Sequence, residues 1–173
     1  PAGYQVDANN DGIVDNLTIV LSGTSALGNT HLLWPQRQNY ILGDSIQGKR
    51  VVSFLMVFDE SNGFKLGAEN PNMPLNTGVL CHEMSHNLGT YDLYHNAKDG
   101  LNPVGVWDLM SNIQPVAQHM TAYTKWRYCH WIDSIPTIST PGTYRLNPIG
   151  GDDSTKIAYK IQPVGRREYF VIE

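Results

Sequence analysis

Two histidines in the segment HEMSHNLGTYDLY have the spacing of metal ligands. His82 and His86 are four residues apart, and a helix places side chains at that spacing on one face. Two imidazoles so placed suit a tetrahedral zinc ion, which binds each nitrogen at about 2.0–2.1 Å. Glu83 follows the first histidine, and from there its carboxylate can take a proton from a zinc-bound water. The pattern therefore predicts a hydrolytic zinc site.

A catalytic zinc ion needs a third protein ligand, and two kinds of zinc hydrolase provide it differently. In one kind a glutamate from a later helix binds the ion, but only Glu168 and Glu173 follow Glu83 here, both in a segment that favours strands. In the other kind a glycine ends the helix and a later side chain returns to the ion. Gly89 and Asp92 complete the spacing H-E-x-x-H-x-x-G-x-x-D. We therefore predict that Asp92 binds zinc through a carboxylate oxygen and that a fourth position stays open.

Two alternatives to this ligand set come from the same segment. A bare H-E-x-x-H also occurs by chance, in which case Asp92 would merely cap the turn after a polar helix end. The glycine and the aspartate at matching offsets argue against that explanation. His95 is the rival of Asp92 as the third ligand, because imidazole is also a common zinc ligand.

The site requires a helix, and the spacing of apolar residues predicts one from about Thr77 to Gly89. Asn76 or Thr77 would be its N-cap, and the glycine can take the left-handed turn that ends it. Two β-rich runs precede the helix, LTIVLSG at 17–23 and KRVVSFLMVFDE at 49–60, with a loop between them that contains HLLWPQRQNY. A strand and loop region thus leads into the site helix.

After the site the pattern of elements changes. A second helix is predicted from Val116 to about Trp131. Beyond Ser134, the runs GTYRLNPI, TKIAYKIQPV and REYFVIE resemble three short strands with turns between them. We therefore predict an α+β fold, with a catalytic core over 1–133 and a β-rich segment, the start of a C-terminal β-domain, over 134–173.

Composition excludes several classes of partner. The 173 residues carry a formal net charge of −4, and no basic run favours nucleic acid. No apolar stretch is long enough to span a bilayer, and no signal-peptide pattern is present. The chain opens with PAGYQVD rather than methionine, so its natural start is expected further upstream. Free thiols at Cys81 and Cys129 are favoured over a bridge, because the first lies in an apolar helix segment.

An acidic loop near the N-terminus has the parts of a calcium site. Alternate side-chain oxygens, a glycine for a sharp turn and a backbone carbonyl come from Asp7, Asn9, Asp11, Gly12, Ile13 and Asp15. The twelfth position is Thr18 rather than the bidentate glutamate of an EF-hand, and a strand follows instead of a helix. We predict a structural Ca²⁺ ion of weak, extracellular-type affinity that stiffens the loop. The alternative is an Asx-rich turn without an ion.

Three stretches together resemble one known family. CHEMSHNLGTYDLY, DANNDGIVDNLTIVLSG and PVGVWDLMSN are similar to segments of the secreted bacterial metallopeptidases of the immune inhibitor A type, the M6 family of the metzincin clan. The likeness spans about residues 4 to 133. It implies a metzincin-like zincin core, a twisted sheet plus the site helix, which lacks the strand and backing helix that usually come first. The residues whose roles it implies are His82, His86 and Asp92 on zinc, Glu83 as general base and Met110 as the Met-turn methionine beneath the metal.

The sequence departs from the clan at one position. Many metzincins carry a tyrosine two residues after the Met-turn methionine, where it assists the transition state, and here that position is Asn112. Tyr94, Tyr123 and His119 are the candidates for this role, and the sequence does not select among them.

The function predicted from these observations is that of a zinc-dependent endopeptidase, secreted or at the cell surface of a bacterial-type cell. Its substrate is a protein or peptide, lying extended beside the sheet. A propeptide or further domains are expected outside this chain. The competing hypothesis is a non-catalytic surface or adhesion module that keeps a structural metal. Glu83 argues against it, because a binding module has no use for a base beside an open zinc position.

Overall fold

The computed structural model describes residues 3–22, 34–58, 77–95, 99–114, 116–153 and 155–173. Contacts divide the chain into two compact units. The first comprises residues 1–87 and 113–117, and the second comprises residues 88–112 and 118–173. The domain boundary between residues 133 and 134 stays a prediction.

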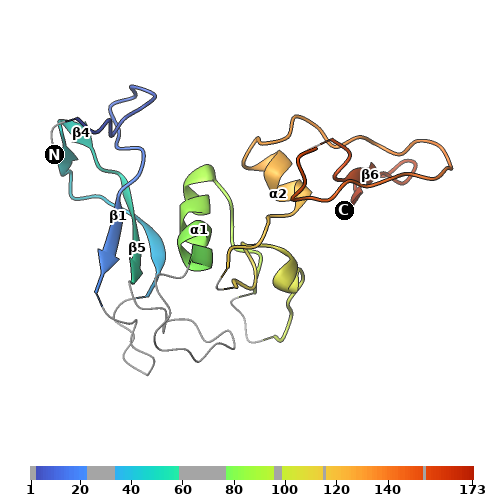
Figure 1. The fold of residues 1–173 in the computed structure, drawn as a ribbon, viewed down its shortest axis with the longest axis horizontal. Helices are drawn as coiled ribbons and strands as arrows, with labels where there is room; N and C mark the ends of the chain where they lie inside the picture. Colours follow the sequence, from blue (N-terminus) through green and yellow to red (C-terminus); the bar gives the residue numbers. More distant parts are fainter. Residues whose placement is uncertain (1–2, 23–33, 59–76, 96–98, 115, 154) are drawn as a thin grey trace. The chain divides into compact units, whose positions relative to one another are not determined.

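A three-stranded sheet in the order β1-β5-β2 forms the centre of the first unit (Figure 1). β1 (Thr18–Leu21) runs parallel to β5 (Ser53–Phe58), and β2 (Gln36–Asn39) runs antiparallel to β5 on its other side. The central strand is the most buried, since Leu55 is 0% and Val57 1% exposed. The run predicted at 17–23 is present as β1. The run predicted at 49–60 contains β5, but its first two residues form a separate short strand at 49–50. Residues 23, 59 and 60 of these runs lie outside the described residues.

The prediction of a loop between these strands is wrong at β2. The strand consists of four polar residues, Gln36–Asn39, of which two are exposed. It lacks the alternation of apolar side chains that marks a half-buried strand, so only its backbone pairing with β5 reveals it. A further hairpin joins β3 (Ser45–Ile46) to β4 (Lys49–Arg50). Its turn residues Gln47 and Gly48 both have positive φ, as a tight two-residue hairpin turn requires.

The site helix α1 (Thr77–Ser85) packs against β5 and β2. Val57, Val79 and Ile113 form the buried cluster at this contact, and Leu80 packs against it. Burial of these side chains fixes one face of the helix on the sheet.

The end of the site helix agrees with the prediction from sequence. α1 begins at Thr77, whereas Asn76 lies outside the described residues. After Ser85 the chain tightens into the 3₁₀ turn η1 (His86–Leu88) and then reverses at Gly89, whose φ is +85°. A residue with a Cβ atom is strained at that angle, so the glycine is what allows the chain to turn back.

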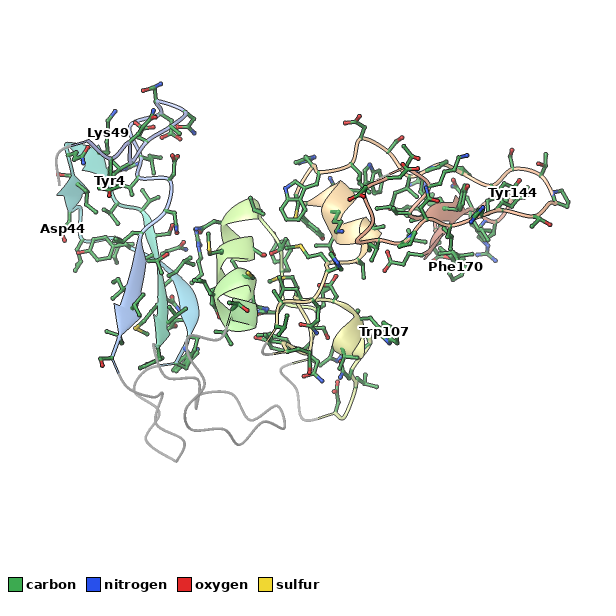
Figure 2. All side chains as sticks on the ribbon, viewed as in Figure 1. Tyr4, Asp44, Lys49, Trp107, Tyr144 and Phe170 are labelled. Atoms are coloured by element: carbon green, nitrogen blue, oxygen red, sulfur yellow. The ribbon has the colours of Figure 1, made fainter. Side chains whose placement is uncertain are left out.

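A helix and a two-stranded sheet share one core in the second unit. α2 (Ala122–Arg127) lies with the antiparallel strands β6 (Tyr159–Ile161) and β7 (Phe170–Ile172). The buried members of this core are Ala122, Ile135, Ile157 and Ala158, with Trp126, Ile132, Ile149 and Val171 packed against them. The unit also contains the 3₁₀ turn η2 (Gly105–Trp107), from which the Trp107 side chain points outward and is 81% exposed (Figure 2).

The second helix is much shorter than the predicted span from Val116 to Trp131. Thr121 has a ψ of 154°, which is not helical, and its side-chain oxygen accepts a hydrogen bond from Thr124 N–H as the N-cap. Beyond α2, His130 has a φ of +54°, which ends the helical path. Apolar spacing continues across both breaks, so it could not reveal them.

Of the three strands predicted beyond Ser134, the run GTYRLNPI (142–149) forms none. Asn147 N–H donates to the Lys156 carbonyl at 3.0 Å. The Tyr144 ring packs edge-on against Tyr159, with the centroids 5.3 Å apart. The Tyr144 side chain of this run thus contacts β6, although the run itself forms no strand.

The mixed sheet with a packed helix fits the predicted α+β class, and the finer metzincin-like form stays a prediction. Cys81 and Cys129 are free thiols, the first half-buried and the second buried. Among the described residues, no helix has the length and apolarity needed to cross a membrane.

Candidate metal centre

The two predicted histidine ligands lie at the end of the site helix. His82 is in α1 and His86 opens η1, so a helical turn separates them. Their ring centroids are 5.0 Å apart, and the rings are nearly perpendicular at 88°. His82 is 2% exposed and His86 is half-buried. One imidazole is therefore anchored in the protein while the other lies nearer the surface.

Asp92 joins the two histidines as a third potential ligand. One donor atom from each of His82, His86 and Asp92 lies within 4.8 Å of the others. Gly89 allows Asp92 to approach the two histidines, because its positive φ reverses the backbone between His86 and Asp92. Asp92 itself is exposed. Two imidazoles with one carboxylate are donors that zinc accepts.

His95, the rival ligand, has a different partner. Its Nδ1 lies 2.8 Å from Asp99 Oδ2, and both side chains are partly exposed. This contact lowers the pKa of the Asp99 carboxyl, and the Leu101 N–H adds to the effect. The group of three donors contains Asp92 and not His95. The ligand role of each residue stays a prediction.

Glu83, the predicted general base, lies in α1 directly after His82. It is 6% exposed, which is unusual for a glutamate. Five of the nine α1 residues are buried, and this glutamate is among them. A buried carboxylate beside two potential zinc ligands is an arrangement suited to proton transfer.

A comparison with known families decides the relationship. The sequence profile of the immune inhibitor A peptidase M6 catalytic domain matches residues 3–122. This chain belongs to that family. Neither the curated proteins nor the solved structures contain a match to it. The M6 match covers the acidic loop, the site helix and the segment around Met110, which are the three stretches that carried the resemblance in the sequence.

M6 peptidases are zinc enzymes, and the His–His–Asp group of this M6 chain agrees with that requirement. The match supports a metallopeptidase.

Met110 is buried, and its backbone is hydrogen-bonded to the segment that carries Asp92. Its side chain is 0% exposed. Its carbonyl oxygen accepts a hydrogen bond of 2.7 Å from Leu93 N–H, and Leu93 directly follows Asp92. The backbone at Met110 thus holds the segment that carries Asp92. The role of Met110 as the Met-turn methionine of this M6 chain stays a prediction.

The three candidates for the missing tyrosine differ in their contacts. The Tyr123 ring packs against Trp126 and Tyr128. The His119 ring lies so close to Gly150 that a Cβ atom there would be 2.3 Å from its Nε2. Tyr94 is 38% exposed and comes two residues after Asp92. At the position where the clan has its tyrosine, two residues after Met110, Asn112 donates its backbone N–H to the Gly105 carbonyl. The choice among the candidates stays open.

Asp108 is a residue whose importance the sequence analysis missed. It is fully buried two residues before Met110, and its Oδ1 accepts the Met110 N–H. The available signal was an acidic residue between Trp107 and Leu109 in an otherwise apolar run. Such a residue is either exposed or hydrogen-bonded in the interior, and only the structure distinguishes the two.

The acidic loop of this M6 chain is closed by its own hydrogen bonds. Asp7 is 3% exposed, and its two oxygens accept the N–H groups of Asp11 and Gly12, each at 3.0 Å. Asp15 Oδ2 accepts Ala8 N–H at 2.7 Å. Backbone N–H groups of the loop are thus hydrogen-bonded to the carboxylates that are predicted to bind calcium.

The positively charged side chain of Lys49 lies beside the acidic loop. Lys49, near the N-terminal loop in Figure 2, places its Nζ 2.7 Å from Asp7 Oδ2. This hydrogen bond is the main cause that lowers the pKa of Asp7, against the opposing effect of burial. An ion that binds Asp7 would therefore meet a carboxylate that is already paired.

Proposed function

We propose that this chain is the catalytic core of a zinc endopeptidase that is secreted or acts at the cell surface. The observation that supports the proposal is the His82–His86–Asp92 group in a chain of the M6 family. Two imidazoles and a carboxylate provide three protein ligands and leave a fourth position for catalysis. A propeptide or further domains outside these residues are part of the same proposal.

The chemistry assigned to the site is hydrolysis of a peptide bond. When bound, zinc supplies Lewis-acid activation of a water molecule and of the peptide carbonyl. Glu83 takes the proton of the attacking water and then delivers it to the leaving amine, first as a base and then as an acid. The buried position of Glu83 limits its contact with bulk water, which favours such a directed transfer.

We infer that β2 is the edge along which an extended substrate binds. Within the described residues, β2 is at one edge of the order β1-β5-β2, and it contacts α1, which carries His82 and Glu83. A peptide can extend a sheet through main-chain hydrogen bonds at such an edge. The half-buried Gln36 and Arg37 side chains would then contribute to the recognition of the substrate.

A non-catalytic module that keeps a structural metal is the competing function. A module of that kind would bind zinc without hydrolysing any peptide. Glu83 favours the peptidase, because a carboxylate buried beside the candidate ligands is placed where a general base would be needed.

Hydrolysis of a broad peptide library by the full natural protein tests the proposal. We expect cleavage by the zinc-loaded protein, loss of cleavage on removal of zinc with a chelator, and recovery when zinc alone is returned. Mass spectrometry of the products identifies the cleaved bonds. Stoichiometric zinc without any cleavage would contradict the peptidase and favour the binding module.

We further propose that the acidic loop binds calcium through Asp7, Asn9, Asp11, Ile13 and Asp15. Hard oxygen donors at alternate positions suit calcium, whereas zinc prefers nitrogen and sulfur. Binding requires the Lys49 ammonium to leave Asp7, which is consistent with weak affinity. The ion would stiffen the entry to β1 and take no part in the chemistry.

Calcium is expected to raise the melting temperature of the protein. At 10 mM calcium and an extracellular-type Kd of about 10⁻⁴–10⁻³ M, mass action adds about 1–3 kcal/mol, which corresponds to a few degrees. Asp11→Ala should remove this increment and leave the zinc content unchanged, because the two sites share no ligand. Asp152→Ala, at an exposed aspartate outside the loop, should keep the increment. Calorimetry with and without calcium measures it, and an unmoved parent curve would refute the calcium site.

A further inference from the structure

Asp108 is a buried carboxylate with both oxygens engaged. Its side chain is 0% exposed. Oδ1 accepts Met110 N–H at 2.7 Å, and Oδ2 accepts Thr121 N–H at 2.7 Å and the Thr124 hydroxyl at 3.3 Å. Burying a charge is unfavourable unless such donors compensate it, and an apolar residue would fill the same space without that cost. The three hydrogen bonds of Asp108 therefore indicate its role in the structure.

Met110 connects this carboxylate to the segment of the candidate metal ligand. The Met110 N–H is held by Asp108, and the Met110 carbonyl accepts Leu93 N–H at 2.7 Å. Leu93 follows Asp92, so this second bond fixes the peptide group that joins the two residues. A continuous path of hydrogen bonds thus leads from α2 through Asp108 and Met110 to the backbone of Asp92.

A simpler role for Asp108 would be to cap the N-terminus of α2, but other side chains already accept N–H groups there. The Thr121 side chain accepts Thr124 N–H at 3.3 Å, and the Glu173 carboxylate accepts Ala122 N–H. Of these three acceptors at the start of α2, Asp108 is the one that also holds Met110. Its distinctive function is therefore the connection between the helix and the Met110 turn.

The charged neighbours of Asp108 do not replace its hydrogen-bond donors. Burial raises the pKa of Glu173, and the negative charge of Asp108 raises it further. Burial lowers the pKa of Lys125, whose ammonium donates to the Ile149 carbonyl at 3.0 Å. The three groups that donate to Asp108 are two backbone N–H groups and one hydroxyl, and all are neutral. The orientation of the Asp108 carboxylate is therefore set by these hydrogen bonds and not by a charged side chain such as Lys125.

We propose that Asp108 is a positioning residue that holds Asp92 ready for the metal ion through the backbone of Met110. This inference rests on the proposed zinc site. A ligand held in place gives up less conformational freedom on binding, and the affinity for zinc is higher as a result. Asp108 touches neither the metal nor the substrate and acts only through the path described above.

Asp108→Asn tests the proposal on the full protein. An amide offers one acceptor oxygen to two N–H donors, so in either orientation the path is released at Met110 or at Thr121. We expect the affinity for Zn²⁺, titrated against a competing chelator, to fall about 10–100-fold. The visible absorption of the Co²⁺-loaded variant should also shift, because the position of a ligand has changed. If this variant does not fold, Asp108→Glu, which displaces both oxygens, is measured in the same way.

Thr124→Val separates positioning from mere stability. The substitution removes the 3.3 Å hydrogen bond from the Thr124 hydroxyl, in α2, to Asp108. It leaves the hydrogen bonds from Met110 N–H and Thr121 N–H to Asp108 in place. It should lower the melting temperature and change the zinc affinity by less than about twofold, a difference within the usual error of additivity. A zinc affinity that falls as far in this variant as in Asp108→Asn overturns the proposal, because helix stability then explains the effect.

A double-mutant cycle with Asp92→Ala identifies the route of the effect. If Asp108 acts through Asp92, then Asp108→Asn should leave zinc affinity almost unchanged once Asp92 is gone. An undiminished effect in that background, or equal zinc affinity of the parent and Asp108→Asn, overturns the inference. Failure of the zinc site itself has a different signature, namely that His86→Ala binds zinc as tightly as the parent.

Discussion

Glu83→Gln is expected to reduce peptide hydrolysis about 10²–10⁴-fold while the protein keeps its zinc. The amide has nearly the same shape as the carboxylate but cannot accept the proton of the attacking water. The histidine and aspartate ligands are untouched, so the metal content stays at that of the parent. The loss should appear in kcat, because proton transfer stabilises the transition state rather than the bound substrate. Initial rates on a cleaved library peptide and metal analysis of the same sample measure both quantities.

The matched control is Glu168→Gln, the same chemical change at an exposed position. It should hydrolyse the peptide at the rate of the parent. Glu83 is 6% exposed, so the folded state of its variant is checked by thermal unfolding before rates are compared. A folded, zinc-loaded Glu83→Gln that cleaves as fast as the parent would assign the base to another residue.

The grouping of the site residues could be anticipated from the sequence because it depends on local geometry. His82 and His86 are brought together by one turn of a helix, and Asp92 by a glycine three residues beyond the second histidine. None of these relations requires contacts between distant segments. The spacing in the chain therefore contains nearly all of the information needed to find the group.

The elements that the sequence mispredicted depend on contacts from elsewhere in the fold. β2 exists because its backbone pairs with β5, although its side chains are polar. α2 is short because Thr121 caps it and Asp108, thirteen residues earlier, accepts the Thr121 N–H. Apolar periodicity reports which side chains are buried, but it does not report the partners of backbone groups.

Asp108 marks the limit of motif-based reasoning most clearly. The segment VWDLMSN draws attention to Met110, since a methionine soon after the ligands matches a known pattern. The aspartate beside it has no such pattern, and its importance follows only from three hydrogen bonds to residues 110, 121 and 124. Candidate ligands can be read from spacing, whereas a residue such as Asp108, which we propose positions one of them, must be found in the structure.

Asp92→Ala is expected to weaken zinc binding by more than about 100-fold, since loss of an outer-shell partner alone costs about 10–100-fold. Two imidazoles would remain, and a two-ligand site retains zinc poorly against a chelator. Asp92 is exposed, so truncating its side chain opens no cavity. Thermal unfolding of the metal-free variant and of the metal-free parent checks that the fold is kept. The increase in melting temperature that zinc gives the parent should shrink accordingly.

His95→Ala is the decisive comparison for Asp92, because His95 is the rival ligand in the same segment. Its imidazole pairs with Asp99 at 2.8 Å, and removing it should leave zinc affinity and hydrolysis close to those of the parent. Competition titrations of zinc on the two variants, performed on matched samples, measure the difference. If His95→Ala loses the metal and Asp92→Ala retains it, then the third ligand is His95. In that case the path through Met110 would hold a segment that carries no ligand at position 92.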